Sequence, residues 1–184
     1  VTSIGNNAFY GCSSLTQISI PSSITSIRDY SFSGCSSLIN LSIPSSVVSI
    51  NDNAFSECTS LLKVEVPSSV NLLGSNAFSG CSKLQQITIP SVTSIGPNCF
   101  NGCSSLKHIS IPSYVSSIED SVFYKCSSLI GIQIPSSIIS IGNHSFSGCS
   151  SLRQITIPSS VTSIGINAFS GCSSLTQISI PSLY

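Results

Sequence analysis

Hydrophobic and polar positions recur along the chain with a period of 23 residues. One unit has the pattern V-x-S-I-G-x-N-A-F-S-G-C-S-S-L-x-x-I-x-I-P-S-S, and eight copies of it fill the sequence. The copies begin at Val1, Ile24, Val47, Val70, Val92, Val115, Ile138 and Val161. The fourth copy is one residue short, because Pro90-Ser91-Val92 lacks the second serine. Self-similarity at this period predicts a solenoid in which each copy forms one coil.

Each copy contains two segments with the character of a β-strand. In L-x-x-I-x-I the isoleucines alternate with polar residues, as Ile18 and Ile20 do around Ser19. This alternation predicts a half-buried strand, which Pro21 then ends because proline has no N–H to donate. A second, shorter extended segment is V-x-S-I. The following N-A-F-S-G-C predicts a reversal of the chain through one 3₁₀ or α-helical turn.

Isolated coils of this kind are not expected to be stable. The first coil offers about seven sizeable apolar side chains, too few to offset the entropy lost when 23 residues are ordered. Stacking buries both faces of each coil, so stability depends on contacts between neighbours. We therefore predict a single solenoid over residues 1–184, built of eight coils of 22–23 residues. Neither end carries a polar cap, which favours a segment of a longer array.

The repeat resembles a known family over the whole chain. The residues that carry the resemblance are Ala168-Phe169-Ser170-Gly171-Cys172, followed by Ser-Ser-Leu and by Ile-x-Ile-Pro-Ser-Ser-Val-x-Ser-Ile across coil boundaries. This pattern resembles the BspA-like (Treponema pallidum-type) class of leucine-rich repeat. The resemblance implies a β-rich leucine-rich-repeat solenoid with a concave parallel sheet of about eight strands, and with short second strands and 3₁₀ or helical turns on the other side.

The same resemblance implies a cell-surface or secreted protein. Members of the class are surface proteins of bacteria and mucosal protists, with proposed roles in adhesion to host matrix and cells. We therefore expect a non-enzymatic protein-binding or adhesion module whose ligand is a protein or a glycan, for example of the host matrix. An intracellular scaffold or regulatory interaction domain is the alternative, and a structural spacer is a second one. Unpaired strand edges at the end coils also predict end-to-end self-association.

Composition excludes several other classes of function. Lys+Arg and Asp+Glu are 6 each, and charged residues make up 7% of the chain. This neutral balance argues against binding of nucleic acid or anionic membrane surfaces, both of which need a basic patch. Apolar runs fall well short of the roughly 20 residues of a membrane-spanning helix, so we expect no membrane insertion in this segment.

Cysteine and phenylalanine form the most conspicuous ladders, with one of each per coil. Cysteines at equivalent positions in adjacent coils lie about one strand spacing apart, roughly 4.8 Å. Their Cβ vectors point the same way, which disfavours disulfides, and a C-x-x-C pair for a metal is missing. We expect buried free thiols, a phenylalanine core, and turn asparagines that cap the turn through backbone hydrogen bonds.

The sequence offers no catalytic, metal or cofactor site. The two histidines, His108 and His144, occupy different positions of the repeat, and neither completes a Ser-His-Asp group. Asp29, Asp52 and Asp120 share one repeat position without forming paired carboxylates or a calcium loop. We therefore expect no enzyme activity, no metal and no cofactor.

Candidate binding residues lie at the outward positions of the longer strand. They vary from coil to coil while the scaffold does not, which is how a solenoid presents different contacts along one surface. Drift at unconstrained solvent positions is an equal alternative. The predicted ligand-binding residues of the concave face are Gln17, Asn40, Lys63, Glu65, Gln86, Thr88, Lys107, His108, Gln133, Arg153, Gln154, Thr156 and Gln177.

Charge distribution predicts an acidic partner for this face. Its basic residues are Lys63, Lys107, His108 and Arg153, with only Glu65 opposing them. The acidic residues Asp29, Asp52, Glu119 and Asp120 belong to the turn after the shorter strand. A sialylated or sulfated glycan is one such partner. Two glycosylation sequons also occur, beginning at Asn40 and at Asn143.

Overall fold

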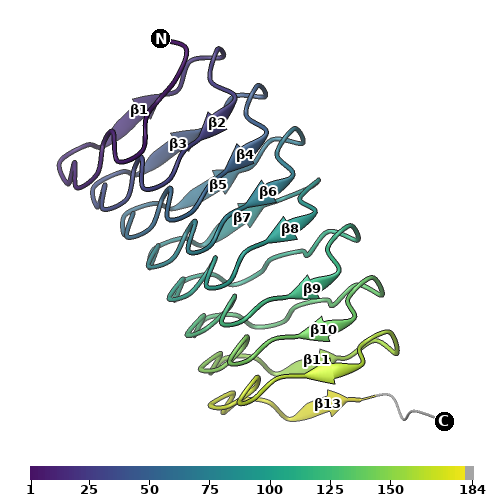
Figure 1. The fold of residues 1–184 in the computed structure, drawn as a ribbon. Helices are drawn as coiled ribbons and strands as arrows, with labels where there is room; N and C mark the ends of the chain where they lie inside the picture. The colour runs from purple at the N-terminus through teal and green to yellow at the C-terminus, as the bar shows by residue number, and fades with distance from the viewer. Residues whose placement is uncertain (181–184) are drawn as a thin grey trace.

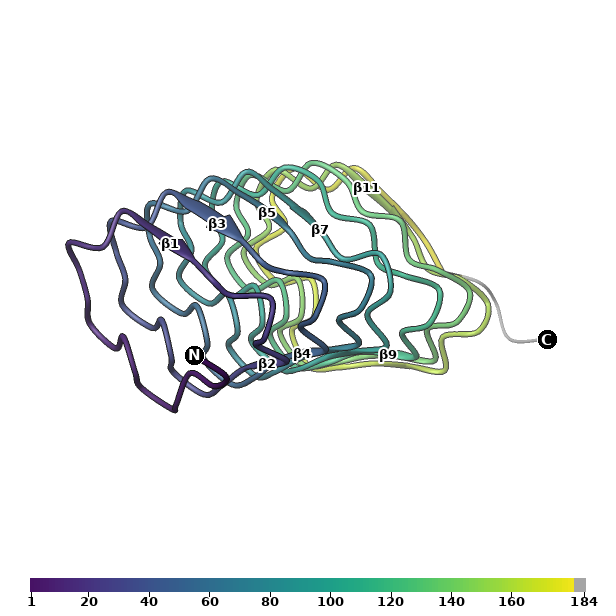
Figure 2. The same ribbon diagram turned by 90° about the horizontal axis from the view of Figure 1, so that it is seen from above.

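The computed structural model describes residues 1–180, and these form a stack of coils that runs from the N-terminus to the C-terminus (Figure 1). We number the coils 1 to 8 by the starting residues given above. The three-residue strands lie on one side of the stack and the two-residue strands on the other (Figure 2). All pairings between strands are parallel and join equivalent residues of neighbouring coils. The predicted solenoid of parallel strands is confirmed.

The longer strands belong to six of the eight coils. They are β1 (Gln17–Ser19), β3 (Asn40–Ser42), β5 (Lys63–Glu65), β7 (Gln86–Thr88), β11 (Gln154–Thr156) and β13 (Gln177–Ser179). Strands β1-β3-β5-β7 form one sheet and β11-β13 another. On this side of the stack, isolated bridges take the place of strands in coils 5 and 6, and they join Gln86 to His108, Ser110 to Gln133 and Gly131 to Gln154.

The predicted sheet of about eight strands is therefore interrupted in the middle of the stack. Coil 4 is the copy that lacks one residue, so coil 5 starts from a shortened turn. Coil 6 has Gly131 inside its strand segment, and glycine weakens a strand because it has no side chain to pack. These two departures from the repeat lie where the continuous pairing is lost.

The shorter strands form a second surface with its own interruption. They are β2 (Ser26–Ile27), β4 (Ser49–Ile50), β6 (Leu72–Leu73), β8 (Ser94–Ile95), β9 (Ser117–Ile118), β10 (Ser140–Ile141) and β12 (Ser163–Ile164). Their order is β2-β4-β6-β8 in one sheet and β12-β10-β9 in the other. The break between β8 and β9 separates coil 5 from coil 6.

The N-A-F-S-G-C segment reverses the chain through tight turns, and the expected 3₁₀ or α-helical turn is absent from residues 1–180. Two residues of this segment in every coil have positive φ, such as Asn53 (φ 55°) and Gly80 (φ 74°). A left-handed residue stops a right-handed helical turn after three residues, and Asn and Gly are the residues that adopt it most readily. The asparagine ladder thus serves the turn through its backbone conformation. Among the described residues, its side chains form one hydrogen bond with another side chain of the same turn, from Asn101 Nδ2 to Asn98 Oδ1.

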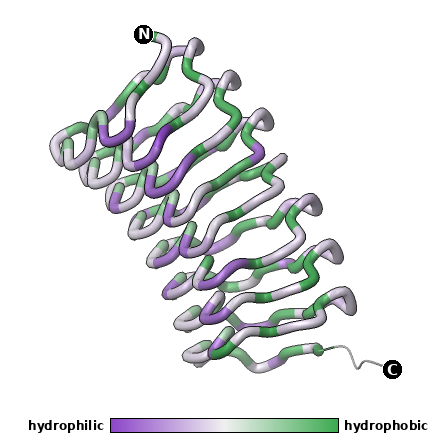
Figure 3. The backbone as a smooth tube through the Cα atoms, viewed as in Figure 1, coloured by the Kyte–Doolittle hydropathy of each residue, from purple (hydrophilic) through white to green (hydrophobic). Residues whose placement is uncertain are grey.

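A column of eight phenylalanine rings fills the core along the axis of the stack. Neighbouring ring centroids lie 5.2 to 6.0 Å apart and the ring planes agree within 16°. Hydrophobic segments recur at the same place in successive coils, which forms one continuous core cluster (Figure 3). The phenylalanine ladder therefore belongs to the core, as predicted, and its rings pack each coil against its neighbours.

The cysteines pack beside this column as free thiols. Seven of the nine are buried. Seven also donate Sγ–H to the phenylalanine carbonyl oxygen of the preceding coil at 3.1 to 3.3 Å, as Cys58 does to Phe32. Burial raises the pKa of Cys58 to about 12, and the neighbouring Cys35 thiol adds to the rise. A thiol with this pKa stays protonated and inert at neutral pH.

Serine closes most coils at the turn after the longer strand. Five serines at the last position of a coil donate their hydroxyl to the carbonyl of its first residue at 2.6 to 2.7 Å, as Ser69 does to Val47. Coil 4 lacks this serine because of its deletion, and coil 5 has Tyr114 in its place. The closing bond is thus missing next to the interruptions in both sheets.

Candidate functional site

The candidate site is the side of the stack formed by the longer strands, which we call the long-strand face. Side chains alternate along these strands, and in β5 Lys63 and Glu65 are exposed while Val64 is buried. This alternation accounts for residues such as Gln86 and Thr88, whereas Lys107 and Arg153 come one residue before the outward strand position of their coils. All thirteen predicted binding residues are exposed to solvent. Whether they bind a ligand stays a prediction.

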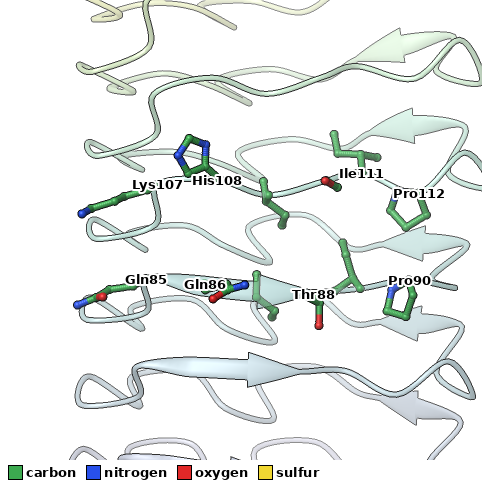
Figure 4. A pocket seen from close by; sticks show the side chains of 12 residues that line it. Gln85, Gln86, Thr88, Pro90, Lys107, His108, Ile111 and Pro112 are labelled. Atoms are coloured by element: carbon green, nitrogen blue, oxygen red, sulfur yellow. The ribbon is translucent and has the colours of Figure 1, made fainter.

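A groove of about 660 Å³ crosses this face between coils 4 and 5 (Figure 4). Gln86, Thr88, Lys107 and His108 line it, which brings four of the predicted residues together. Buried isoleucines form much of its apolar wall, and the remaining lining residues are Gln85, Ile87, Ile89, Pro90, Ile109, Ser110, Ile111 and Pro112. In Figure 4, Lys107 extends from the end where the strands begin, whereas Pro112 marks the opposite end. One isolated bridge joins the two coils here, between Gln86 and His108.

Two further hollows divide most of the other predicted residues between them. A hollow of about 640 Å³ over coils 1 to 4 includes Gln17, Asn40, Lys63, Glu65 and Thr88. Another of about 610 Å³ over coils 6 to 8 includes Gln133, Gln154, Thr156 and Gln177. The structure therefore divides these residues among separate local surfaces rather than gathering them into one pocket. Arg153 lies outside these three hollows, on the edge where the strands begin.

Electrostatics on this face differ from the sequence prediction in one respect. Lys63 Nζ lies 2.7 Å from Glu65 Oε1, an ion pair within one strand. The hydrogen bond and charge of Lys63 lower the pKa of Glu65 below its usual value. Lys63 therefore adds little net positive charge, and the basic character of the face rests on Lys107 and Arg153.

The acidic residues on the opposite side have a structural role that the sequence analysis did not assign. Asp52 Oδ1 accepts a hydrogen bond from the Ser75 amide of the next coil at 2.7 Å, and Asp120 Oδ1 accepts one from the Asn143 amide at 2.7 Å. Asn143 Oδ1 continues the series to the amide of Ile166. The sequence feature that could have predicted this role is the repeat position that Asp52 and Asp120 share, because equivalent positions of neighbouring coils face each other in a stack.

The two histidines of the chain lie in different parts of their coils. Residues 1–180 contain no group of three His, Cys, Asp or Glu side chains placed to hold a metal ion. His108 lies on the long-strand face, whereas His144 is a turn residue with φ 53° whose ring meets the edge of Tyr124. The described residues also form no helix long and apolar enough to cross a membrane.

Stacked parallel coils with this repeat define a leucine-rich-repeat solenoid. The chain belongs to the BspA type leucine rich repeat region family, whose six-copy model matches residues 2–92 and 76–184. No curated protein sequence matches the chain.

Solved structures from several bacteria share the fold. A leucine-rich repeat protein from Bacteroides ovatus ATCC 8483 is 28% identical with a TM-score of 0.70, over 97% of this chain and 58% of that chain. The T. pallidum leucine rich repeat protein is 30% identical with a TM-score of 0.71, over 92% and 69% respectively. A leucine rich cell surface protein from Faecalibacterium prausnitzii A2-165 is 32% identical with a TM-score of 0.52, over 94% and 62%. The chain thus spans less than two thirds of the length of the Bacteroides protein.

Proposed function

We propose that this chain is a non-enzymatic protein-binding and adhesion module of a surface or secreted protein, and that its ligand lies along the long-strand face. The observation that carries the proposal is the contrast between scaffold and surface. Core positions repeat almost without change, whereas the exposed strand positions vary along the stack and line three hollows. Family membership supports protein interaction, and the name of the Faecalibacterium protein supports a surface location.

Binding would combine many weak contacts on a rigid support. The stacked phenylalanine column and the backbone ladders hold the strands in register, so little conformational freedom remains to be lost when a partner binds. Exposed amides such as Gln86 and Gln154 offer both donors and acceptors to a partner. Display of several copies on one surface would raise the overall avidity without any new contact.

The test is binding of the chain to immobilised matrix proteins, mucins and glycans. A Gln86→Arg, Gln154→Arg variant places two bulky charges on the long-strand face. A matched Thr25→Arg, Ser116→Arg variant places the same two charges at exposed positions beside the shorter strands. We expect saturable binding that the first variant loses and the second retains.

Equal loss in both arginine variants would contradict a site on the long-strand face. Absence of binding to every extracellular target would overturn the adhesion proposal in favour of an intracellular scaffold. Circular dichroism of both variants checks that the substitutions leave the solenoid folded.

A further inference from the structure

A fourth hollow, of about 300 Å³, lies along the edge of the stack where the longer strands begin. It extends over coils 5 to 8, and we call it the strand-start groove. Its lining residues are Lys107, Ser128, Ile130, Ser151, Arg153 and Ser174. Lys107 also lines the larger groove between coils 4 and 5. Arg153 lines the strand-start groove and none of the other three hollows.

Both cations of this groove are uncompensated. Lys107 and Arg153 are exposed, and the single ion pair within residues 1–180 joins Lys63 to Glu65 instead. Beyond Glu65 the only acidic residues are Glu119 and Asp120, both in the turn after the shorter strand. Glu119 accepts a hydrogen bond from Ser117 at 2.5 Å, and Asp120 is bonded to Asn143. Among the residues that the structure describes, the groove therefore has positive charge and no carboxylate.

Three serine hydroxyls in the groove are available to a ligand. Ser128, Ser151 and Ser174 occupy the same position in coils 6, 7 and 8, and within the described residues their hydroxyls form no hydrogen bond. The serines just before them bond to the preceding coil, as Ser127 Oγ does to Ser104 at 3.3 Å. One serine of each pair thus supports the stack, and the other presents a free hydroxyl to the groove.

The spacing of these groups matches an extended peptide. Lys107 and Arg153 are two coils apart, which is about 9.6 Å at a strand spacing of about 4.8 Å. A polyproline II segment places every third residue on one face at intervals of about 9.3 Å. Ile130 lies between the cations with 39% of its surface exposed, and offers an apolar contact to the backbone of such a peptide. Within residues 1–180 the lining of the groove includes no aromatic residue on which a sugar ring could stack.

We infer that the strand-start groove binds an acidic, extended protein segment with two carboxylates three residues apart. One carboxylate pairs with Lys107 and the other with Arg153, while the serine hydroxyls donate to the same carboxylates or to peptide carbonyls. This inference rests on the proposed protein-binding function and names the chemical class of the partner.

The probe is the peptide acetyl-Pro-Glu-Pro-Pro-Glu-Pro-amide, titrated into the ¹⁵N-labelled chain at low salt while the backbone amide shifts are followed. We expect shifts clustered at Ser128, Ile130 and Ser151, and binding that weakens as salt is added. A Lys107→Ser, Arg153→Ser variant should bind about five-fold more weakly, as expected for the loss of two exposed ion pairs. A matched Lys63→Ser, Arg28→Ser variant should bind as the parent chain does.

Equal binding of the peptide with Gln in place of Glu would overturn the inference, as would unchanged binding by the Lys107→Ser, Arg153→Ser variant. Shifts caused in the groove by a heparin hexasaccharide but not by the peptide would overturn it in favour of a glycan. If the peptide fails while the matrix panel still detects binding sensitive to Gln86→Arg, Gln154→Arg, the proposed function stands without this partner class.

Discussion

Tyr114 provides a direct test of how the coils are held closed. In five coils the equivalent residue is a serine whose hydroxyl donates to the first carbonyl of its own coil at 2.6 to 2.7 Å. Tyr114 cannot make this bond in coil 5, and its side chain is 66% exposed. Substitution Tyr114→Ser should supply the missing donor to the carbonyl of Val92.

The expected gain in the free energy of unfolding is about 1 kcal/mol, the usual net worth of a neutral hydrogen bond, within a range of about 0.5–1.5 kcal/mol. Removal of the tyrosine ring loses little, because most of its surface is already in water. The reverse experiment is Ser69→Ala, which removes the 2.6 Å bond to Val47 and should cost a similar amount.

Urea unfolding measures both changes, and native-state hydrogen exchange locates them. Ser113→Ala is the matched control, because Ser113 is the exposed neighbour of Tyr114. Both sheets are interrupted around coils 5 and 6, so amides there should exchange faster than those of coils 2 to 4. We expect Tyr114→Ser to slow that local exchange. Neutral effects of both Tyr114→Ser and Ser69→Ala would refute the role assigned to the closing bond.

Three further predictions follow from the core and the turns. Burial raises the pKa of Cys58 and of Cys149 to about 12 in the folded chain, against about 8.5 when unfolded. The thiols of the unfolded state therefore lose their protons first as pH rises. The free energy of unfolding is at its full value below about pH 8.5 and falls above it, and each buried thiol lowers it by up to about 1.4 kcal/mol per pH unit. A urea midpoint that stays constant from pH 7 to pH 10.5 would contradict this. Phe100→Ala removes a fully buried ring whose centroid lies 5.7 and 6.0 Å from those of its two stacked neighbours. It should lower the free energy of unfolding, measured by urea titration, by about 3–5 kcal/mol. A loss below about 1 kcal/mol would argue against the phenylalanine column as the main support of the stack. Lys125 has φ 57° at a position where six other coils have glycine, and a left-handed conformation strains the backbone of a residue with a Cβ atom. Lys125→Gly should therefore stabilise the chain by about 1 kcal/mol. A lower thermal midpoint in this variant would count against backbone strain at Lys125.

The repeat itself determined most of the architecture. Because equivalent residues of stacked coils must face each other, one phenylalanine per copy predicts a continuous aromatic column, and alternation in the longer strand separates Val64 from Lys63 and Glu65. The ion pair between Lys63 and Glu65 was also within reach of the sequence, since residues two apart on a strand share a face.

Tertiary structure decided what depends on how neighbouring coils fit together. Both sheets are interrupted near coils 5 and 6, close to two small departures from the repeat, a missing serine and Gly131. Whether adjacent backbones pair is visible only once the coils are stacked. Left-handed turn residues took the place of the expected helical turn, and they include Tyr30 and Ser121, whose residue types do not favour positive φ. The grooves that place Lys107 near Arg153 and Gln86 near His108 exist only once the stack has formed, since each is lined by residues from different coils.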